Sequence, residues 1–83
     1  MADRQEIKNA LKIHFQETSR YTPEDGDNLF EKGVLDSFGV VEFLTFLESR
    51  FGVTIPIEDI TEANFSTVDT VTNLILNQIP ETE

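Results

Sequence analysis

The chain has 83 residues, of which 16 are acidic and 6 basic, and it contains no cysteine or tryptophan. A chain of this length forms one domain with one small core, so we expect a single domain over residues 1–83 and exclude a large enzyme with a cleft between subdomains. Without cysteine the protein has no disulfide, thiolate metal site or nucleophilic thiol of its own. The net charge of −10 disfavours nucleic acids and anionic membranes as direct partners, because both bind clustered Lys and Arg side chains.

The charge is unevenly distributed along the sequence. Residues 1–35 hold 5 basic and 7 acidic side chains, whereas residues 36–83 hold 1 basic and 9 acidic side chains. The second half should therefore present an acidic surface, and the charge favours a monomer. The N-terminal segment lacks the apolar run of a signal peptide, and no apolar stretch approaches about 18 residues. We expect a cytoplasmic protein.

Helical patterns occupy most of the chain. The spacing of apolar side chains predicts a first helix from Asp3 to about Glu17, with Asp3 as its N-cap. Residues 18–36 have neither helical nor strand period, but their apolar side chains predict an ordered loop pinned to the core. From Ser37 to Phe51 one apolar face predicts a central helix that ends at Gly52 in a left-handed cap.

The last third of the chain carries two further helical signals. Glu58 and Asp59 suit the first turn of a short third helix that we expect to reach about Glu62 or Ala63, with Ile57 and Ile60 pointing inward. A capping signal at residues 66–69 opens a final helix, whose apolar stripe includes Ile79 and which ends at Pro80. The predicted fold class is all-α: a small four-helix bundle, with three main helices, one short helix and a long ordered loop between helices one and two.

Two polar features of the sequence, residues 25–28 and His14, suggest a metal or catalytic site, but their sequence context does not support one. Asp25-Gly26-Asp27-Asn28 resembles a calcium loop, but Leu29 and Phe30 occupy the positions where an EF-hand needs a ligand and a glycine. His14 is the only histidine, and it shares a helix face with apolar residues. We expect His14 to be a partly buried packing residue, and we predict neither a metal site nor a catalytic residue.

The most informative segment is Gly33 to Gly39, where a loop delivers Asp36 and Ser37 to the start of the central helix. One explanation is helix capping by either side chain. Capping needs only one of the two, and Val40 stands where a capping box would need Glu or Gln. The other side chain is then free, and a serine at a helix N-terminus tolerates an attached phosphate.

The motif Leu35-Asp36-Ser37-Phe38, followed by Val41-Glu42-Phe43 and by the segment 47–56, resembles the acyl carrier proteins and their aminoacyl, peptidyl and D-alanyl carrier relatives. The resemblance covers essentially the whole chain. It implies that Ser37 bears 4′-phosphopantetheine, derived from coenzyme A, whose thiol holds an acyl or aminoacyl group as a thioester. Phe38 and Gly39 depart from the fatty-acid carriers and are closer to aminoacyl, D-alanyl or specialised polyketide carriers, so the cargo stays open.

The resemblance also implies a partner surface rather than an active site. The sequence offers neither a general base nor an oxyanion hole for Ser37, so we predict that the protein is not an enzyme. Its partners would be a phosphopantetheinyl transferase and basic-surfaced loading and acyl-processing enzymes. The residues implied in recognition lie on the outward face of the central helix and on the third helix: Asp36, Phe38, Val41, Glu42, Glu48, Asp59, Ile60 and Glu62.

Two alternatives stay open at this point. Phe38 either anchors a partner or folds over Leu35. The alternative function is an acidic helical adaptor that acts only by protein contact and is never modified. An added phosphopantetheine on Ser37 separates the carrier from the adaptor.

Overall fold

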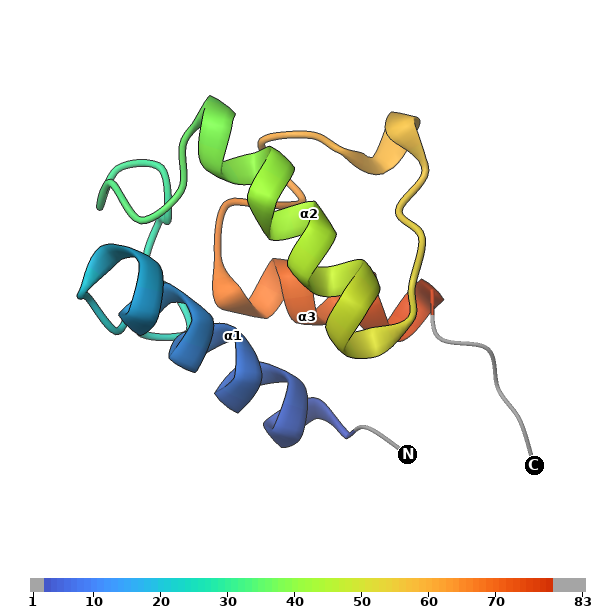
Figure 1. The fold of residues 1–83 in the computed structure, drawn as a ribbon, viewed down its shortest axis with the longest axis horizontal. Coiled ribbons are helices and arrows are strands. Elements are labelled where there is room, and N and C mark those ends of the chain that lie inside the picture. The colour runs from blue at the N-terminus through green and yellow to red at the C-terminus, as the bar shows by residue number, and fades with distance from the viewer. Residues whose placement is uncertain (1–2, 79–83) are drawn as a thin grey trace.

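The structure is a computed structural model that describes residues 3–78, and three α-helices enclose its core (Figure 1). Helix α1 spans Arg4–Ser19, α2 spans Ser37–Phe51 and α3 spans Val68–Gln78, while a short 3-10 helix, η1, spans Ile57–Asp59. From the C-terminal end of α2 the chain passes through η1 and runs back towards the start of α2 before α3 begins (Figure 1). Residues 3–78 contain no strand, so the all-helical prediction is confirmed.

Helix α1 begins at the predicted cap. The Asp3 carboxylate accepts the Glu6 N–H at 2.8 Å, and the Glu6 carboxylate accepts the Asp3 N–H at 3.4 Å, which completes a capping box. The helix extends beyond the predicted end at Glu17 to Ser19, because Arg20 closes it in the left-handed conformation with φ of 64°. Ile13 lies off the buried stripe and is 59% exposed.

The long first loop is ordered by apolar contacts, as predicted. Leu29, Val34 and Leu35 are buried in the core, and the Leu29 N–H donates to the Ser66 carbonyl at 2.6 Å. The core and the Ser66 carbonyl therefore hold the loop in place before it reaches Asp36. This fixes the position from which α2 begins.

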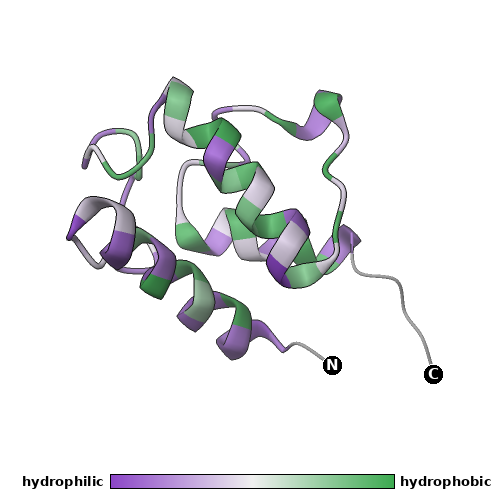
Figure 2. Ribbon diagram, viewed as in Figure 1, coloured by the Kyte–Doolittle hydropathy of each residue, from purple (hydrophilic) through white to green (hydrophobic). Residues whose placement is uncertain are grey.

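Helix α2 supplies the centre of the core. Phe43 and Leu47 are fully buried, and the ring of Phe43 stacks on Phe15 of α1 with centroids 5.0 Å apart. Gly52 ends the helix with φ of 69°, which confirms the predicted left-handed cap. Figure 2 shows hydrophobic residues on all three helices. The buried ones form one cluster: Ile7, Leu11, Phe15, Leu29, Val34, Leu35, Phe43, Leu47, Val53, Ile55, Phe65, Val68, Val71, Leu74 and Ile75.

His14 packs at the edge of this cluster. Its imidazole stacks on Phe46, with ring centroids 4.1 Å apart and an interplanar angle of 20°. Burial lowers the pKa of His14, so the neutral imidazole is favoured against these rings. The predicted packing role is confirmed.

The predicted short third helix is confirmed only in part. Only the 3-10 helix η1 forms, over Ile57–Asp59, so the four-helix bundle is not confirmed. The Asp59 carbonyl accepts the Asn64 side-chain amide at 2.8 Å and the Thr61 N–H at 3.0 Å, which replaces the bonding pattern of a continuing α-helix. Ile57 is 85% exposed rather than inward, whereas Ile60 is partly buried.

Helix α3 begins where the capping signal predicted. The Thr67 hydroxyl accepts the Thr70 N–H at 3.0 Å, and the Thr70 hydroxyl accepts the Thr67 N–H at 3.1 Å. This reciprocal pair satisfies two backbone donors at the start of the helix. The predicted continuation to Ile79 and Pro80 lies outside the described residues. Among the described helices, none is both long enough and apolar enough to cross a membrane.

Candidate functional site

Ser37 is the first residue of α2, and its side chain is exposed. The preceding residue, Asp36, is the N-cap, because its carboxylate accepts the Gly39 N–H at 2.7 Å. No group within residues 3–78 hydrogen-bonds the Ser37 hydroxyl. Of the two capping alternatives, the structure thus assigns the cap to Asp36 and leaves the Ser37 oxygen free.

The backbone around Ser37 favours negative charge. The first hydrogen bond of α2 runs from the Val40 N–H to the Asp36 carbonyl at 2.8 Å, so the N–H groups of Ser37 and Phe38 come before the helical ladder. Unpaired N–H groups and the positive end of the helix dipole stabilise an anion at this end. A phosphate ester on the Ser37 oxygen fits this setting.

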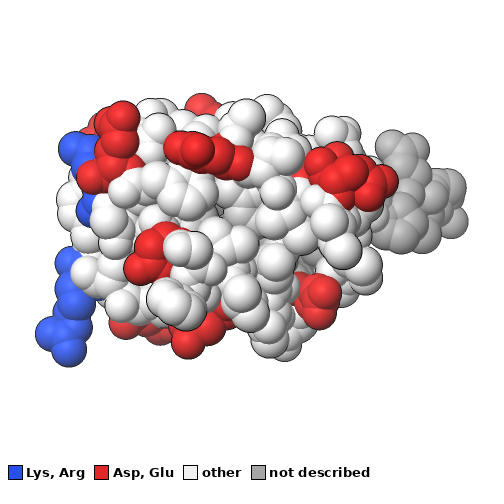
Figure 3. Space-filling view, turned by 90° about the horizontal axis from the view of Figure 1, so that it is seen from above, with Lys and Arg blue, Asp and Glu red and all other residues white. Residues whose placement is uncertain are grey.

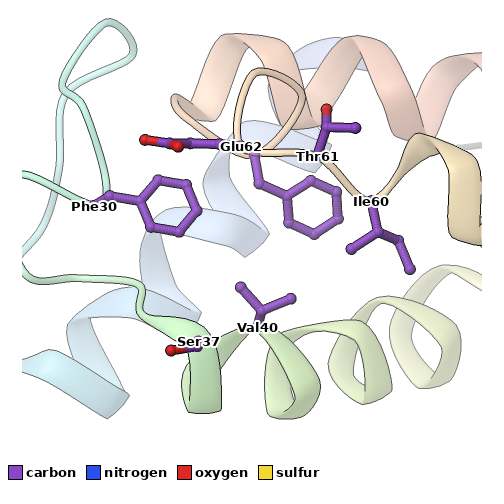
Figure 4. A pocket seen from close by; sticks show the side chains of 7 residues that line it. Phe30, Ser37, Val40, Ile60, Thr61 and Glu62 are labelled. Carbon is purple, nitrogen blue, oxygen red and sulfur yellow. The ribbon is translucent and has the colours of Figure 1, made fainter.

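A pocket of about 350 Å³ opens beside Ser37, between α2 and the segment that follows η1 (Figure 4). Its apolar walls come from three parts of the chain, and Ser37 lies at its edge. Phe30, Val40 and Ile60 point toward the hollow, while Thr61 and Glu62 point away from its centre (Figure 4). The full lining is Phe30, Ser37, Val40, Ile60, Thr61, Glu62 and Phe65.

Two large apolar side chains stand in solvent on the outer surface of α2. Phe38 is 87% exposed and Val41 is 65% exposed. Phe38 therefore does not fold over Leu35, which is buried. Figure 3 shows acidic side chains spread over the face seen from above, with Lys and Arg confined to one end.

The other residues implied in partner recognition fall into two groups. Asp36, Glu42 and Glu48 are exposed along α2, and Glu62 is exposed beyond η1. Asp59 is half-buried, and Ile60 lines the pocket instead of facing outward.

The sequence reasoning missed several residues around Ser37. Phe65, which walls the pocket, was not singled out, Phe30 was expected only to help pin the loop to the core, and Ile57 was expected inside. A signal for Phe30 existed in the adjacent apolar pair Leu29-Phe30, because one buried residue suffices to pin the loop. Within residues 3–78, no group of three or more His, Asp or Glu side chains is arranged to hold a metal ion.

The comparisons with known proteins identify the class of protein. The family described as "Phosphopantetheine attachment site" matches residues 9–75 of this chain, a range that includes the whole of α2 and the pocket. The chain is also 38% identical over 74 residues to a D-alanyl carrier protein of Bacillus velezensis, covering 88% of this chain and 92% of that protein.

Two further relatives have the same name. A D-alanyl carrier protein of Streptococcus suis is 36% identical over 60 residues, which cover 72% of each chain. One of Streptococcus pyogenes serotype M5 is 37% identical over 57 residues, covering 69% of this chain and 68% of that protein. The protein therefore belongs to the family of phosphopantetheine-binding carrier proteins.

Membership of this family defines the general role of the protein. It is a carrier that holds acyl or aminoacyl groups as thioesters on a covalently attached 4′-phosphopantetheine and presents them to partner enzymes. This role favours the carrier over the unmodified adaptor. It also accounts for the absence of cysteine, because the thiol belongs to the attached arm.

Proposed function

We propose that this protein is a D-alanyl carrier whose arm is attached to Ser37, and that residues 1–83 act as one carrier domain in the cytoplasm. Three relatives that match most of this chain are D-alanyl carrier proteins, which supports D-alanine as the cargo. The Phe38-Gly39 pair after the serine supports the same assignment, since it departs from the pattern of fatty-acid carriers.

The single observation that carries the choice of Ser37 is its free hydroxyl. The oxygen is exposed at the start of α2, while the cap that the helix needs comes from Asp36. The unpaired N–H groups of Ser37 and Phe38 would hold a phosphodiester at this atom, and the pocket residues Phe30, Val40 and Ile60 would offer apolar contacts to the arm. These residues fit the group that the family carries.

The attachment is a group transfer from coenzyme A. The O–H bond of Ser37 breaks, and a new bond joins its oxygen to the phosphorus of 4′-phosphopantetheine. The phosphoanhydride bond of coenzyme A breaks, adenosine 3′,5′-bisphosphate leaves, and the hydroxyl proton passes to a base of the transferase. Once bound, the arm supplies a thiol that forms the thioester with D-alanine.

The chain itself would provide position and recognition rather than catalysis. Its only histidine, His14, stacks on Phe46 and makes no hydrogen bond to Ser37, so the hydroxyl has no imidazole base. Phosphopantetheinyl transfer and aminoacyl loading would be performed by partner enzymes. We therefore propose that this protein is not an enzyme.

The partner surface is the outward side of α2 around Ser37. Phe38 and Val41 offer exposed apolar area for contact, and the exposed carboxylates of Glu42 and Glu48 would meet Lys and Arg side chains of partners. Exposed ion pairs contribute roughly 0.2–1 kcal/mol each and are screened by salt. Such contacts speed association without preventing release, as a shuttle between enzymes requires. Asp36, Asp59 and Glu62 extend the acidic surface, and Ile60 contributes from the pocket wall.

The mass of the intact protein tests the attachment site. Incubation with coenzyme A and a phosphopantetheinyl transferase should add one 4′-phosphopantetheine to the wild type and none to Ser37→Ala. Ser49→Ala is the matched control, because Ser49 is an exposed serine of the same helix and should leave the modification intact. An unchanged wild-type mass, or a modified Ser37→Ala, would contradict the proposal.

The cargo is tested on the modified protein. With ATP and a D-alanine-activating enzyme, the mass should rise by one alanyl group, and hydroxylamine, which cleaves thioesters, should remove it. Loading with L-alanine or with acyl groups in preference to D-alanine would contradict the choice of cargo while leaving the attachment site in place.

A further inference from the structure

Gly39 is an unusual residue for its position. It lies in the first turn of α2, where glycine destabilises a helix relative to alanine because it loses more backbone freedom on folding. The backbone does not demand glycine here, because the glycines with positive φ in this structure are Gly33 and Gly52. The reason for Gly39 must therefore lie in its surroundings.

Those surroundings contain one close group. A Cβ atom at Gly39 would lie 3.1 Å from Oδ1 of Asp36, and the next nearest side chain is Leu35, whose Cδ1 would be 3.8 Å away. No atom of another helix would lie closer than these. Helix packing does not explain the glycine, whereas the carboxylate of Asp36 does.

That carboxylate is the N-cap of α2. Its Oδ1 accepts the Gly39 N–H at 2.7 Å, while the backbone of Asp36 is extended, with φ of −140° and ψ of −176°. The cap sets the angle at which the extended loop turns into the helix. Ser37 is the next residue at this turn, so the cap also fixes the backbone that carries its side chain.

Apart from the Gly39 N–H, little holds the Asp36 carboxylate in place. Asp36 and Gly39 also border a second hollow of about 180 Å³, which His14, Thr18 and Glu42 help to line. A new Cβ atom at 3.1 Å would push the carboxylate by a few tenths of an ångström, and this hollow gives it room to move away from the Gly39 N–H. The cap geometry thus depends on the missing side chain.

We propose that Gly39 is a positioning residue for the transfer reaction at Ser37. Because Gly39 has no side chain, the Asp36 carboxylate can cap α2 closely, and this cap holds the Ser37 hydroxyl in position for the reaction. The inference rests on the proposed attachment to Ser37. Gly39 would act through Asp36 and contact neither coenzyme A nor the arm.

The test is Gly39→Ala, followed through the rate of arm transfer and through thermal unfolding. Alanine improves helix propensity by about as much as a weakened cap costs, so the melting temperature should change little. The kcat of transfer should fall about tenfold, because small displacements of a reacting atom are costly, while KM should not change since Phe38 and Val41 are untouched. A merely structural role would give the opposite pattern, with stability lost and the rate retained.

Gly26→Ala is the matched control. A Cβ atom at Gly26 would meet nothing within 4 Å, and its φ is not positive. This variant should be modified at the wild-type rate. If the wild type itself is not modified, the attachment proposal fails; if wild type and Gly39→Ala have the same kcat, only the role of Gly39 fails.

A double-mutant cycle with Asp36→Ser identifies the mechanism and covers the case in which Gly39→Ala does not fold. Serine is also a good N-cap, and its shorter side chain withdraws the oxygen from the new Cβ atom. Asp36→Ser will lower the rate by itself, but adding Gly39→Ala should then cost little. A tenfold loss of rate on adding Gly39→Ala to Asp36→Ser, which can be measured even if Gly39→Ala alone does not fold, would overturn the proposal.

Discussion

Phe38 combines two properties that rarely occur together in one surface residue. It is aromatic and 87% exposed, and it directly follows the serine of the proposed attachment site. Its exposed ring contributes little to the fold, because it does not pack on the core. Aromatic side chains are enriched among the residues that dominate binding at protein interfaces. A role in partner binding gives a reason for its exposure.

We expect Phe38→Ala to separate folding from recognition. The free energy of unfolding should change by less than about 0.5 kcal/mol, since the ring is in solvent. The KM for the phosphopantetheinyl transferase should rise about tenfold, because an aromatic anchor contributes more than about 1 kcal/mol to binding. Steady-state kinetics and thermal unfolding measure the two effects.

Ile13→Ala is the control for this prediction. Ile13 is also an exposed apolar residue, at 59%, but it belongs to α1 and lies outside the partner surface. Its replacement should leave KM unchanged. An equal KM for Phe38→Ala and the wild type would show that Phe38 is not part of the partner surface.

At the scale of the elements, a cluster of ion pairs fastens the first loop to two helices. The carboxylate of Asp25 lies 2.8 Å from the ammonium of Lys8 and 2.7 Å from that of Lys12, both on α1. Lys8 also lies 3.0 Å from the carboxylate of Asp69 on α3, and the Asp69 N–H donates to the Asp25 carbonyl at 3.2 Å. The cluster therefore helps to hold the loop that ends at Asp36.

This cluster makes stability depend on pH in acid. Lys12 and Lys8 lower the pKa of Asp25 from 3.8 to about 2. The ionised carboxylate therefore stabilises the fold fully above pH 3.8, and this contribution is lost as the pH falls through about 2. Since the Asp25 side chain is 36% exposed, solvent screening limits each ion pair to about 1 kcal/mol or less.

We expect Asp25→Asn to lower the melting temperature at pH 7, with a loss of about 1–2 kcal/mol for the two ion pairs. The difference from the wild type should shrink below pH 3.8 and become small as the pH falls through about 2. Thermal unfolding across this range measures it. Glu24→Gln removes a nearby charge of the same loop without breaking these ion pairs, so its effect should be smaller. A difference that persists unchanged at pH 2 would refute the ion-pair explanation.

The elements that were predictable from the sequence carry their own local signals. The cap at Asp3, the glycine at the end of α2 and the apolar stripes of the three α-helices each lie within a few residues of the structure they specify. The segment 57–63 is too short for a helical stripe, and its path depends on the bond from Asn64 to Asp59. A local pattern could not predict that outcome.

The site also combines a local motif, which the sequence predicts, with contacts that depend on the fold. The motif around Ser37 is continuous in the sequence, so it could be found without coordinates. The pocket could not, because Phe30, Val40 and Phe65 come from the first loop, from α2 and from the segment before α3. Whether Asp36 or Ser37 caps α2 also needed the geometry, since both residue types are good caps.

At the scale of the whole molecule, repulsion between carboxylates opposes folding. The net charge is −10, and the longest dimension of the molecule is 38 Å. The Debye length is about 30 Å at 0.01 M salt and about 8 Å at 0.15 M. At low salt, carboxylates therefore repel one another across most of the protein, whereas at physiological salt only near neighbours interact.

We expect the melting temperature to rise when NaCl is increased from 0.01 M to 0.15 M, because salt screens long-range repulsion more than ion pairs in direct contact. The ion pairs of Lys8 and Lys12, at 2.7–3.0 Å, should lose less than the repulsion does. Magnesium chloride at the same ionic strength tests the cause. An equal melting temperature in both salts indicates screening, and a higher one in magnesium indicates cation binding by the acidic surface. An unchanged or lower melting temperature at the higher NaCl concentration would contradict the argument from charge.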